Sequence, residues 1–245
     1  MKGFLVRIGI DSTYGKWNAP CDPKSGEFLY VSIPENQTFR KGFERYYDEV
    51  IPYIRKFAEM QGIDIQSLRF PLSLIGTKLH LDPDFEYLTY GDNGLKRGKR
   101  LRELDPGDFI AFYASLKPVN LYPEKFMYAL VGFYEIAQIQ KANEIPENEL
   151  HINAHTRKQK IFEEDLIVRA KPGVSGRLTK CIPIGKLRNR VYRVKQNLLN
   201  EWGGLSAKDG FIQRNNPYPW FTDPERFITW LKKQHVELVQ RNNNV

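Results

Sequence analysis

Short apolar runs bounded by Gly, Pro and Asp recur along the chain, and this pattern predicts β-strands. The clearest run is PGDFIAFYASL (106–116), in which a Pro-Gly-Asp turn leads into aromatic and β-branched residues. FMYALVGFYEIAQI (126–139) follows as a longer strand, with Gly132 at a bend or bulge. The two runs predict an antiparallel pair, and shorter runs predict strands over 4–10, 28–33, 165–171 and 181–186.

Helical spacing is confined to three segments. Residues 43–62 carry Pro52 in the first turn and Gly62 at the end, and residues 192–204 end in two glycines. The last helix begins with Thr222 and Glu225 in capping-box spacing, and its apolar stripe comprises Phe227, Trp230, Leu231 and Leu238. With no internal repeat, the pattern predicts a single α+β domain over residues 1–240. The tail RNNNV (241–245) is expected to be disordered.

Composition narrows the class of protein. Hydrophobic residues make up 41% of the 245, which is enough for a sizeable core. No apolar run approaches the ~20 residues of a membrane helix, and the N-terminal MKGFLVRIGID is broken by Arg7, unlike a signal peptide. Cys21 and Cys181 are the only cysteines, which argues against a disulfide framework or a cysteine zinc site. We therefore expect a cytoplasmic protein that does not bind membranes.

The net charge of +8 is concentrated in one stretch. Residues 157–195 hold 12 Lys/Arg against 3 Asp/Glu, and the rest of the chain is close to neutral. This predicts a face that meets a polyanion, favouring nucleic acid over a solvated surface, a phosphate-rich small molecule or an anionic membrane. The candidate phosphate-binding residues are Arg157, Lys171, Arg177, Lys180, Lys186, Arg188, Arg190 and Arg193.

The motif His80-Leu-Asp82-Pro-Asp84-Phe carries the densest candidate chemistry. In a strand, Asp82 and Asp84 would lie on one face and could join His80 at a hard metal ion, with Asp11 or His155 supplied from afar. Alternatively, the two aspartates cap a turn and a short helix around Pro83. The motif lacks a second nearby His or Cys, so we expect no bound metal and no other cofactor.

Two loops offer further candidates. Asp11-Ser12 opens a long loop (11–27) that also carries Tyr14, Trp17 and Asn18. A nucleophilic Ser12 would need a histidine in space, so hydrogen bonding of Asp11 and Ser12 to the following turn is favoured. Asn153 and His155 precede the basic stretch, either as polar surface or as groups that read a base edge.

The strand pair carries a first resemblance. Gly107-Asp108-Phe-Ile-Ala-Phe-Tyr113 followed by Leu130-Val-Gly-Phe-Tyr-Glu-Ile136 resembles the PUA-like superfamily, which includes EVE, YTH and ASCH domains. The resemblance implies a mixed or antiparallel β-barrel with helical additions. It also implies an aromatic cage around a flipped or unpaired base.

A second resemblance covers more of the chain. Asp11-Ser-Thr-Tyr-Gly15 with Pro20, the motif His80–Phe85 and the pair 106–139 are similar to the third family of nucleotide-modification-associated domains, found among prokaryotic and phage proteins. The resemblance implies association with base-modification systems and no established chemistry. The loop GKWNAPC departs from the Gly-Gly and Pro-Ser-Pro expected there, so Trp17 and Asn18 have no counterpart in the family pattern.

The leading hypothesis favours a nucleic-acid-binding module over an enzyme. The module would recognise a modified or extruded base, with DNA as the expected partner. Its candidate ligand residues are Ser12, Tyr14, Trp17, Asn18, His80, Asp82, Tyr90, Tyr113, Asn153, His155 and Trp220. One alternative is a hydrolase or nuclease acting on nucleic acid, with catalytic candidates Asp11, Ser12, His80, Asp82 and Asp84. A small-nucleotide sensor is the third hypothesis, and the oligomeric state is left open.

Overall fold

Two long strands form the centre of the molecule, as predicted for residues 106–139. In the computed structural model, which describes residues 1–95, 97–214 and 217–243, β6 (Phe109–Pro118) and β7 (Met127–Lys141) pair antiparallel from Phe109↔Glu135 to Leu116↔Met127. A register shift interrupts the pair between Phe112 and Tyr113, opposite Gly132, where a bend or bulge is predicted.

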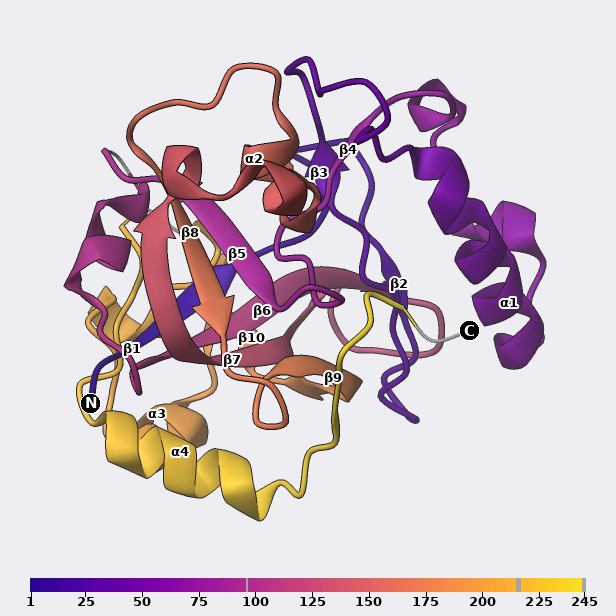
Figure 1. Cartoon of the computed structure of the whole chain (residues 1–245). Coiled ribbons are helices and arrows are strands. Elements are labelled where there is room, and N and C mark those ends of the chain that lie inside the picture. Colours follow the sequence, from indigo (N-terminus) through magenta and orange to yellow (C-terminus); the bar gives the residue numbers. More distant parts are fainter. Residues whose placement is uncertain (96, 215–216, 244–245) are drawn as a thin grey trace.

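The remaining strands extend this pair into a large mixed sheet of order β1-β6-β7-β8-β5 (Figure 1). β1 runs parallel to β6, β8 pairs antiparallel with β7 and β5, and β9 joins β7 to β12. The bounds are β1 (Gly3–Arg7), β2 (Pro20–Cys21) beside β6, β5 (Thr89–Asn93), β8 (Asp165–Ala170), β9 (Gly176–Pro183) and β12 (Leu238–Val239). Two small pairs stand apart: β3 (Ile33–Pro34) with β4 (Leu79–His80), and β10 (Gly185–Arg188) with β11 (Val191–Val194).

The sheet does not close into the expected barrel. Among the described residues, no pairing joins β5 to β1, the two ends of the main strand order. The architecture is therefore α+β with a large mixed sheet. Because the barrel is not found, this sheet does not establish the PUA-like fold.

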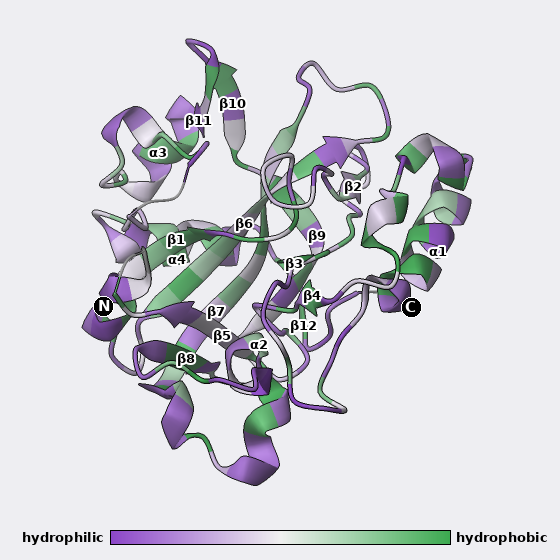
Figure 2. Cartoon of the chain, turned by 90° about the horizontal axis from the view of Figure 1, so that it is seen from above, coloured by the Kyte–Doolittle hydropathy of each residue, from purple (hydrophilic) through white to green (hydrophobic). Residues whose placement is uncertain are grey.

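Both faces of the central pair are buried, because alternate residues of β6 enter different hydrophobic clusters. Ile110 and Phe112 pack with α1 (Ile51–Gln61) on one face. Phe109 and Tyr113 pack with α3 (Gln196–Trp202) and α4 (Pro224–Lys233) on the other. Figure 2 shows the hydrophobic colouring gathered on these inner strands. No described helix has the length and apolar character needed to cross a membrane.

The helix ends test the predicted caps. Pro52 lies in the first turn of α1 and Gly62 ends it in the left-handed region at φ 63°, as predicted. At α4, however, the N-cap is Asp223, which accepts from the backbone N–H of Arg226, while the Thr222 hydroxyl donates to the carbonyl of Gly203. The helix stops at Lys233, so Leu238 pairs in β12 instead of extending the apolar stripe.

One contact bears on both the strand predicted over 28–33 and the described part, 241–243, of the tail predicted to be disordered. Residues Phe28–Val31 are buried. However, the backbone N–H and carbonyl of Tyr30 bond to a side chain, where in a sheet they would bond to the backbone of a neighbouring strand. The Asn243 amide accepts from Tyr30 N at 2.9 Å and donates to Tyr30 O at 2.8 Å. Residues 241–243 are therefore held against the body of the fold, and 244–245 lie outside the described residues.

Candidate functional site

Three side chains from two distant segments converge beside the sheet. His80 ends β4, Asp82 follows it, and His155 lies in the short helix α2 (Ala154–Arg157). One ligand atom from each lies within 4.8 Å of the other two, and the imidazole rings of His80 and His155 are 5.0 Å apart. We call this group the His80–Asp82–His155 centre. It matches the hypothesis from the sequence that His155 reaches the motif from a distant segment.

Asn153 joins the two segments. As the N-cap of α2, its side-chain oxygen accepts from the backbone N–H of His155 at 2.9 Å, and its amide nitrogen donates to Asp82 Oδ1 at 2.8 Å. Asn153 is fully buried, so it lies neither on a polar surface nor where it could read a base.

Gly91 provides the space in which His155 lies, a role that no sequence signal indicates. Its backbone N–H also donates to Asp82 Oδ1, at 2.8 Å. A Cβ on Gly91 would stand 2.5 Å from Cδ2 of His155 and 2.7 Å from Oδ1 of Asn153. Only a glycine lets β5 approach the centre this closely.

Each histidine has a buried carboxylate beside its Nδ1. Glu35 Oε2 lies 2.6 Å from Nδ1 of His80, and Asp165 Oδ2 lies 3.0 Å from Nδ1 of His155. Sequence reasoning missed both carboxylates, because Glu35 follows β3 and Asp165 begins β8, far from the motif in sequence. Because a carboxylate lies beside Nδ1 of each ring, Nε2 is the nitrogen left for chemistry.

The centre is rich in negative charge. Burial raises the pKa of the Asp82 carboxyl, against the lowering effect of the two histidines and its hydrogen bonds. Burial alone would also raise the pKa of Glu35 and of Asp165, but the adjacent histidine outweighs it in each case and holds the pKa below its ordinary value. The Lys158 ammonium, 3.9 Å from Asp165 Oδ2, is the nearby cation.

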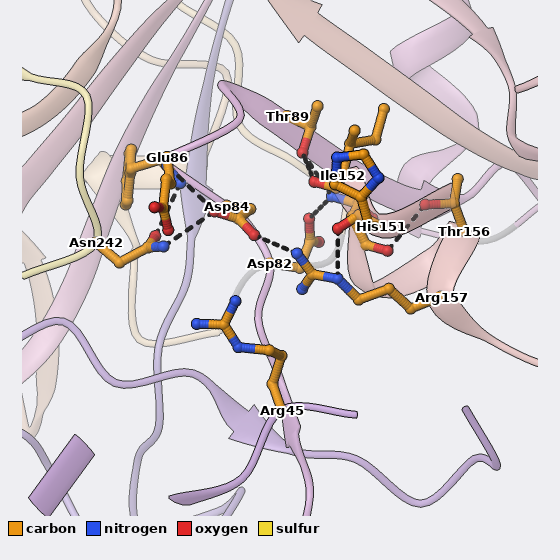
Figure 3. Close-up of polar contacts among 12 residues, drawn as sticks. Arg45, Asp82, Asp84, Glu86, Thr89, His151, Ile152, Thr156, Arg157 and Asn242 are labelled. Atoms are coloured by element: carbon orange, nitrogen blue, oxygen red, sulfur yellow. Dashed lines mark hydrogen bonds and ion pairs between the residues drawn. The ribbon is translucent and has the colours of Figure 1, made fainter. Parts of the chain in front are cut away.

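The second aspartate of the motif has a different role (Figure 3). Asp84 is fully buried and pairs with Arg157 at 2.6 Å, while its other oxygen accepts from Asn242 Nδ2 and the backbone N–H of Glu86. Asp82 and Asp84 therefore do not share a site as the strand hypothesis proposed. Asp84 instead caps a turn over residues 85–88, where the alternative expected a short helix. Arg157 is in the core, away from any phosphate-binding face.

Asp11 also has a local role. Oδ1 accepts from the backbone N–H groups of Thr13 and Tyr14, and Oδ2 pairs with Arg7 at 2.7 Å. This is the turn role that the sequence favoured. Ser12 is exposed, and neither residue joins the His80–Asp82–His155 group found among the described residues.

The aromatic candidates do not form a cage. Trp17 is buried and its indole donates to Leu68 O at 2.7 Å; Tyr90 and Tyr113 are also in the core. Asn18 is likewise buried and donates to Ser115 O. The two exposed candidates are Tyr14 and Trp220, and the guanidinium of Arg100 lies 3.9 Å from the centre of the Trp220 ring.

The basic stretch is dispersed by the fold. Besides Arg157, Arg177 is fully buried, with its guanidinium over the ring of Phe28, and burial lowers the pKa of Arg177 to about 10. Lys171 pairs with Glu135, and Lys180 is exposed on β9. The β10–β11 hairpin carries the rest, namely Lys186, Arg188, Arg190 and Arg193, of which Arg188 and Arg193 pair with Asp209. Figure 2 places this hairpin at the end of the molecule away from α2.

A cleft adjoins the centre at Glu35. It encloses about 570 Å³ and is lined in part by Phe39, Tyr46 and Lys78. Tyr46 is exposed, so its ring is available to a ligand, and Lys78 supplies a positive charge. Glu35 both lines this cleft and contacts His80, so the cleft lies beside one member of the centre, although none of the three centre residues is part of its lining.

Comparison with known proteins identifies one relationship. The family model described as nucleotide modification associated domain 3 matches residues 2–242, nearly the whole chain. No curated protein matches. No solved structure matches either.

Proposed function

Because this chain belongs to the family of nucleotide modification associated domain 3, we propose that it is an enzyme that hydrolyses a phosphoester of a nucleotide or nucleic acid. The chemistry is assigned to the His80–Asp82–His155 centre. The family name associates the chain with nucleotide modification, and the reaction and its residues are our inference.

The observation that carries the proposal is the convergence of two oriented imidazoles on a buried carboxylate. Burying a carboxylate costs free energy unless hydrogen bonds or charges compensate it. Here Asn153 and Gly91 hold one oxygen of Asp82, and Glu35 and Asp165 hold the two rings. Such a set of fixed polar groups with a shifted carboxyl pKa is typical of catalytic sites.

The geometry fits hydrolysis. An imidazole Nε2 can take the proton of an attacking water as its oxygen bonds to phosphorus, and the second imidazole can give a proton to the leaving ester oxygen as the P–O bond breaks. In the adjoining cleft, the Lys78 ammonium can contact a phosphate and the exposed Tyr46 ring can stack on a base. Substrate recognition and chemistry thus have adjacent places.

The base-recognition hypothesis receives less support. Its physical basis is an aromatic cage, and Trp17, Tyr90 and Tyr113 lie in the core. Nucleic acid remains the partner class that the charge of +8 favours.

The test is turnover by the purified protein of a panel of nucleoside mono-, di- and triphosphates and of oligonucleotides with unmodified and modified bases. We expect His155→Ala and Asp82→Asn to lower kcat/KM at least ~100-fold, the scale for losing a catalytic acid or base. His151→Ala is the matched control, because this histidine lies in the same segment but packs against Tyr87. Turnover retained by both centre variants would refute the proposal. Tight binding of a modified oligonucleotide without any turnover would favour the base-recognition hypothesis.

A further inference from the structure

We propose that His80, Asp82 and His155 bind one divalent first-row transition-metal ion, through Nε2 of each imidazole and a carboxylate oxygen of Asp82. This deepens the proposed function, on whose centre it rests, by naming the cofactor of that centre.

The orientation of the two rings is the first argument. Histidines that ligate metals usually donate their other ring N–H to a carboxylate, carbonyl or water, which fixes the tautomer and strengthens the ligand. His80 has that arrangement, with Glu35 at 2.6 Å, and the Asp165 carboxylate lies 3.0 Å from Nδ1 of His155, in contact but outside hydrogen-bond geometry. The Lys158 ammonium lies farther from His155 Nδ1, at 3.5 Å, so Asp165 is its closer partner.

The third ligand is prepared in the same way. Among the described donors, Gly91 N and Asn153 Nδ2 both bond to Oδ1 of Asp82, which leaves Oδ2 for a cation. Metal–nitrogen and metal–oxygen distances of about 2.1 Å allow two ligands of one ion to be at most about 4.2 Å apart. In tetrahedral geometry two such ligand atoms lie only about 3.4 Å apart, so the observed spacing of up to 4.8 Å needs a contraction of up to ~1.4 Å.

The charge of the surroundings is the second, independent argument. Asp82 belongs to the centre, Glu35 and Asp165 each contact one of its histidines, and the Lys158 ammonium lies beside Asp165. Three carboxylates beside one ammonium are an excess of anionic groups, and buried charges need partners. A divalent cation supplies that compensation without protonating the ligands.

The ligand types define the class of metal. Two imidazoles and one carboxylate suit zinc, iron(II), cobalt or manganese better than magnesium or calcium, which prefer oxygen ligands. Three protein ligands also leave coordination positions for water and for a substrate oxygen, as in catalytic sites and unlike closed structural ones. With Nε2 of both imidazoles bound to the ion, the proton transfers assigned to them would pass to the ion and water. The ion would lower the pKa of a bound water that attacks phosphorus and offset charge on the phosphate, and the leaving oxygen would take its proton from water.

The metal revises the expectation drawn from the motif alone. We expected none because no second histidine or cysteine is near His80 in the sequence. In the structure α2 places His155 beside it, so the reason for that expectation no longer holds.

The test uses the full chain stripped with chelator and then titrated with Co²⁺, followed by visible absorption, and with Zn²⁺, followed by calorimetry. We expect one equivalent of each to bind the wild type and to raise its Tm. His155→Ala and Asp82→Asn should lose at least ~100-fold in affinity, and Glu35→Gln, which alters only the support of His80, about 10- to 100-fold. His151→Ala should bind as the wild type does.

The outcomes separate the two proposals. Failure of the wild type to bind either ion stoichiometrically, or wild-type affinity in all three variants, would overturn the metal site. Turnover that persists in excess chelator would also overturn it, while leaving the hydrolase intact. Stoichiometric binding lost in the variants, with no substrate on the panel turned over, would uphold the metal site and remove the proposed hydrolysis. The metal-induced rise in Tm of the wild type gives a result even where a variant does not fold.

Discussion

Gly91→Ala is the substitution that probes the centre with the smallest change of chemistry. Gly91 lies in β5, and its backbone needs no glycine conformation, so the added methyl acts only through contact. That methyl would meet His155 Cδ2 at 2.5 Å and Asn153 Oδ1 at 2.7 Å, where ordinary contact begins at about 3.4 Å. The His155 ring or the Asn153 cap must therefore move by roughly 1 Å.

The magnitude follows from the two consequences of that shift. Overpacking a buried position costs about 1–3 kcal/mol of the free energy of unfolding, which in a domain of this size lowers Tm by about 2–4 °C per kcal/mol. A misplacement of ~1 Å at a reacting centre can cost ~100-fold in rate. We therefore expect Gly91→Ala to lower metal affinity and kcat/KM by about 10- to 100-fold while the protein remains folded at 25 °C.

The control is a glycine that creates a similar clash elsewhere. Gly185→Ala would place its methyl 2.5 Å from Cβ of Tyr128, in the hydrophobic cluster beneath α3 and α4. It should lower Tm to a similar extent and leave metal affinity and turnover unchanged. Thermal unfolding, metal titration and steady-state kinetics on both variants decide the matter. If Gly91→Ala lost stability but kept wild-type affinity and turnover, the placement of His155 in the centre would be wrong.

Four other changes test separate parts of the molecule. Asp84→Asn breaks the buried ion pair with Arg157, and we expect denaturant titration to show a loss of about 3–5 kcal/mol. Burial alone would raise the pKa of Asp22, but hydrogen bonds from the following turn and an asparagine hold it at about 2. Its folded-state pKa is thus below the unfolded one, so ~1–2 kcal/mol of stability is present above pH ~4 and lost as the pH falls toward 2. Asp22→Asn should make the free energy of unfolding, measured by denaturant titration across that pH range, depend less steeply on pH. A pH dependence identical to that of the wild type would contradict the assignment. Arg190→Ala, at the tip of the exposed hairpin, should reduce the log–log salt slope of duplex DNA binding by about 1, whereas an unchanged slope would mark the hairpin as solvated. Trp17→Ala should cost about 3–5 kcal/mol of stability and leave any preference for a modified base unchanged, since the ring is core.

The elements predicted correctly are those whose signals are local. The β6–β7 pair follows from the Pro-Gly-Asp turn and two β-rich runs, and the end of α1 follows from Gly62 alone. Local signals fail where a residue distant in sequence supplies the hydrogen bonds that a neighbouring strand would otherwise supply. Tyr30 lies in a strand-like run, yet its backbone is satisfied by the Asn243 amide, a contact that no periodicity can indicate.

The candidate site was predicted only in part for the same reason. His80, Asp82, Asn153 and His155 were all named as candidates, but their grouping depends on the packing of α2 against the loop after β4. Glu35 and Asp165 had no distinguishing signal, because a carboxylate in a loop or at a strand start is ordinary in sequence. The charge pattern was misleading, because Arg157 and Arg177 add to the basic count while lying in the core.

The two segments that meet at the centre have the same internal spacing, and this explains how one motif can be both structural and functional. Asp82 and Asp84 are two residues apart, as are His155 and Arg157. The first residue of one pair lies beside the first of the other, and the second beside the second. The outer contact is the Asp84–Arg157 ion pair, fully buried and fixed further by Asn242. The inner contact is the approach of Asp82 to His155, bridged by Asn153. Since α2 is only one turn long, it has little stability of its own. The ion pair therefore holds α2 against the motif, so that the imidazole and the carboxylate of the centre are already in place before a cation or a substrate arrives. A preorganised centre of this kind binds its ligand without the free-energy cost of ordering the helix at that moment.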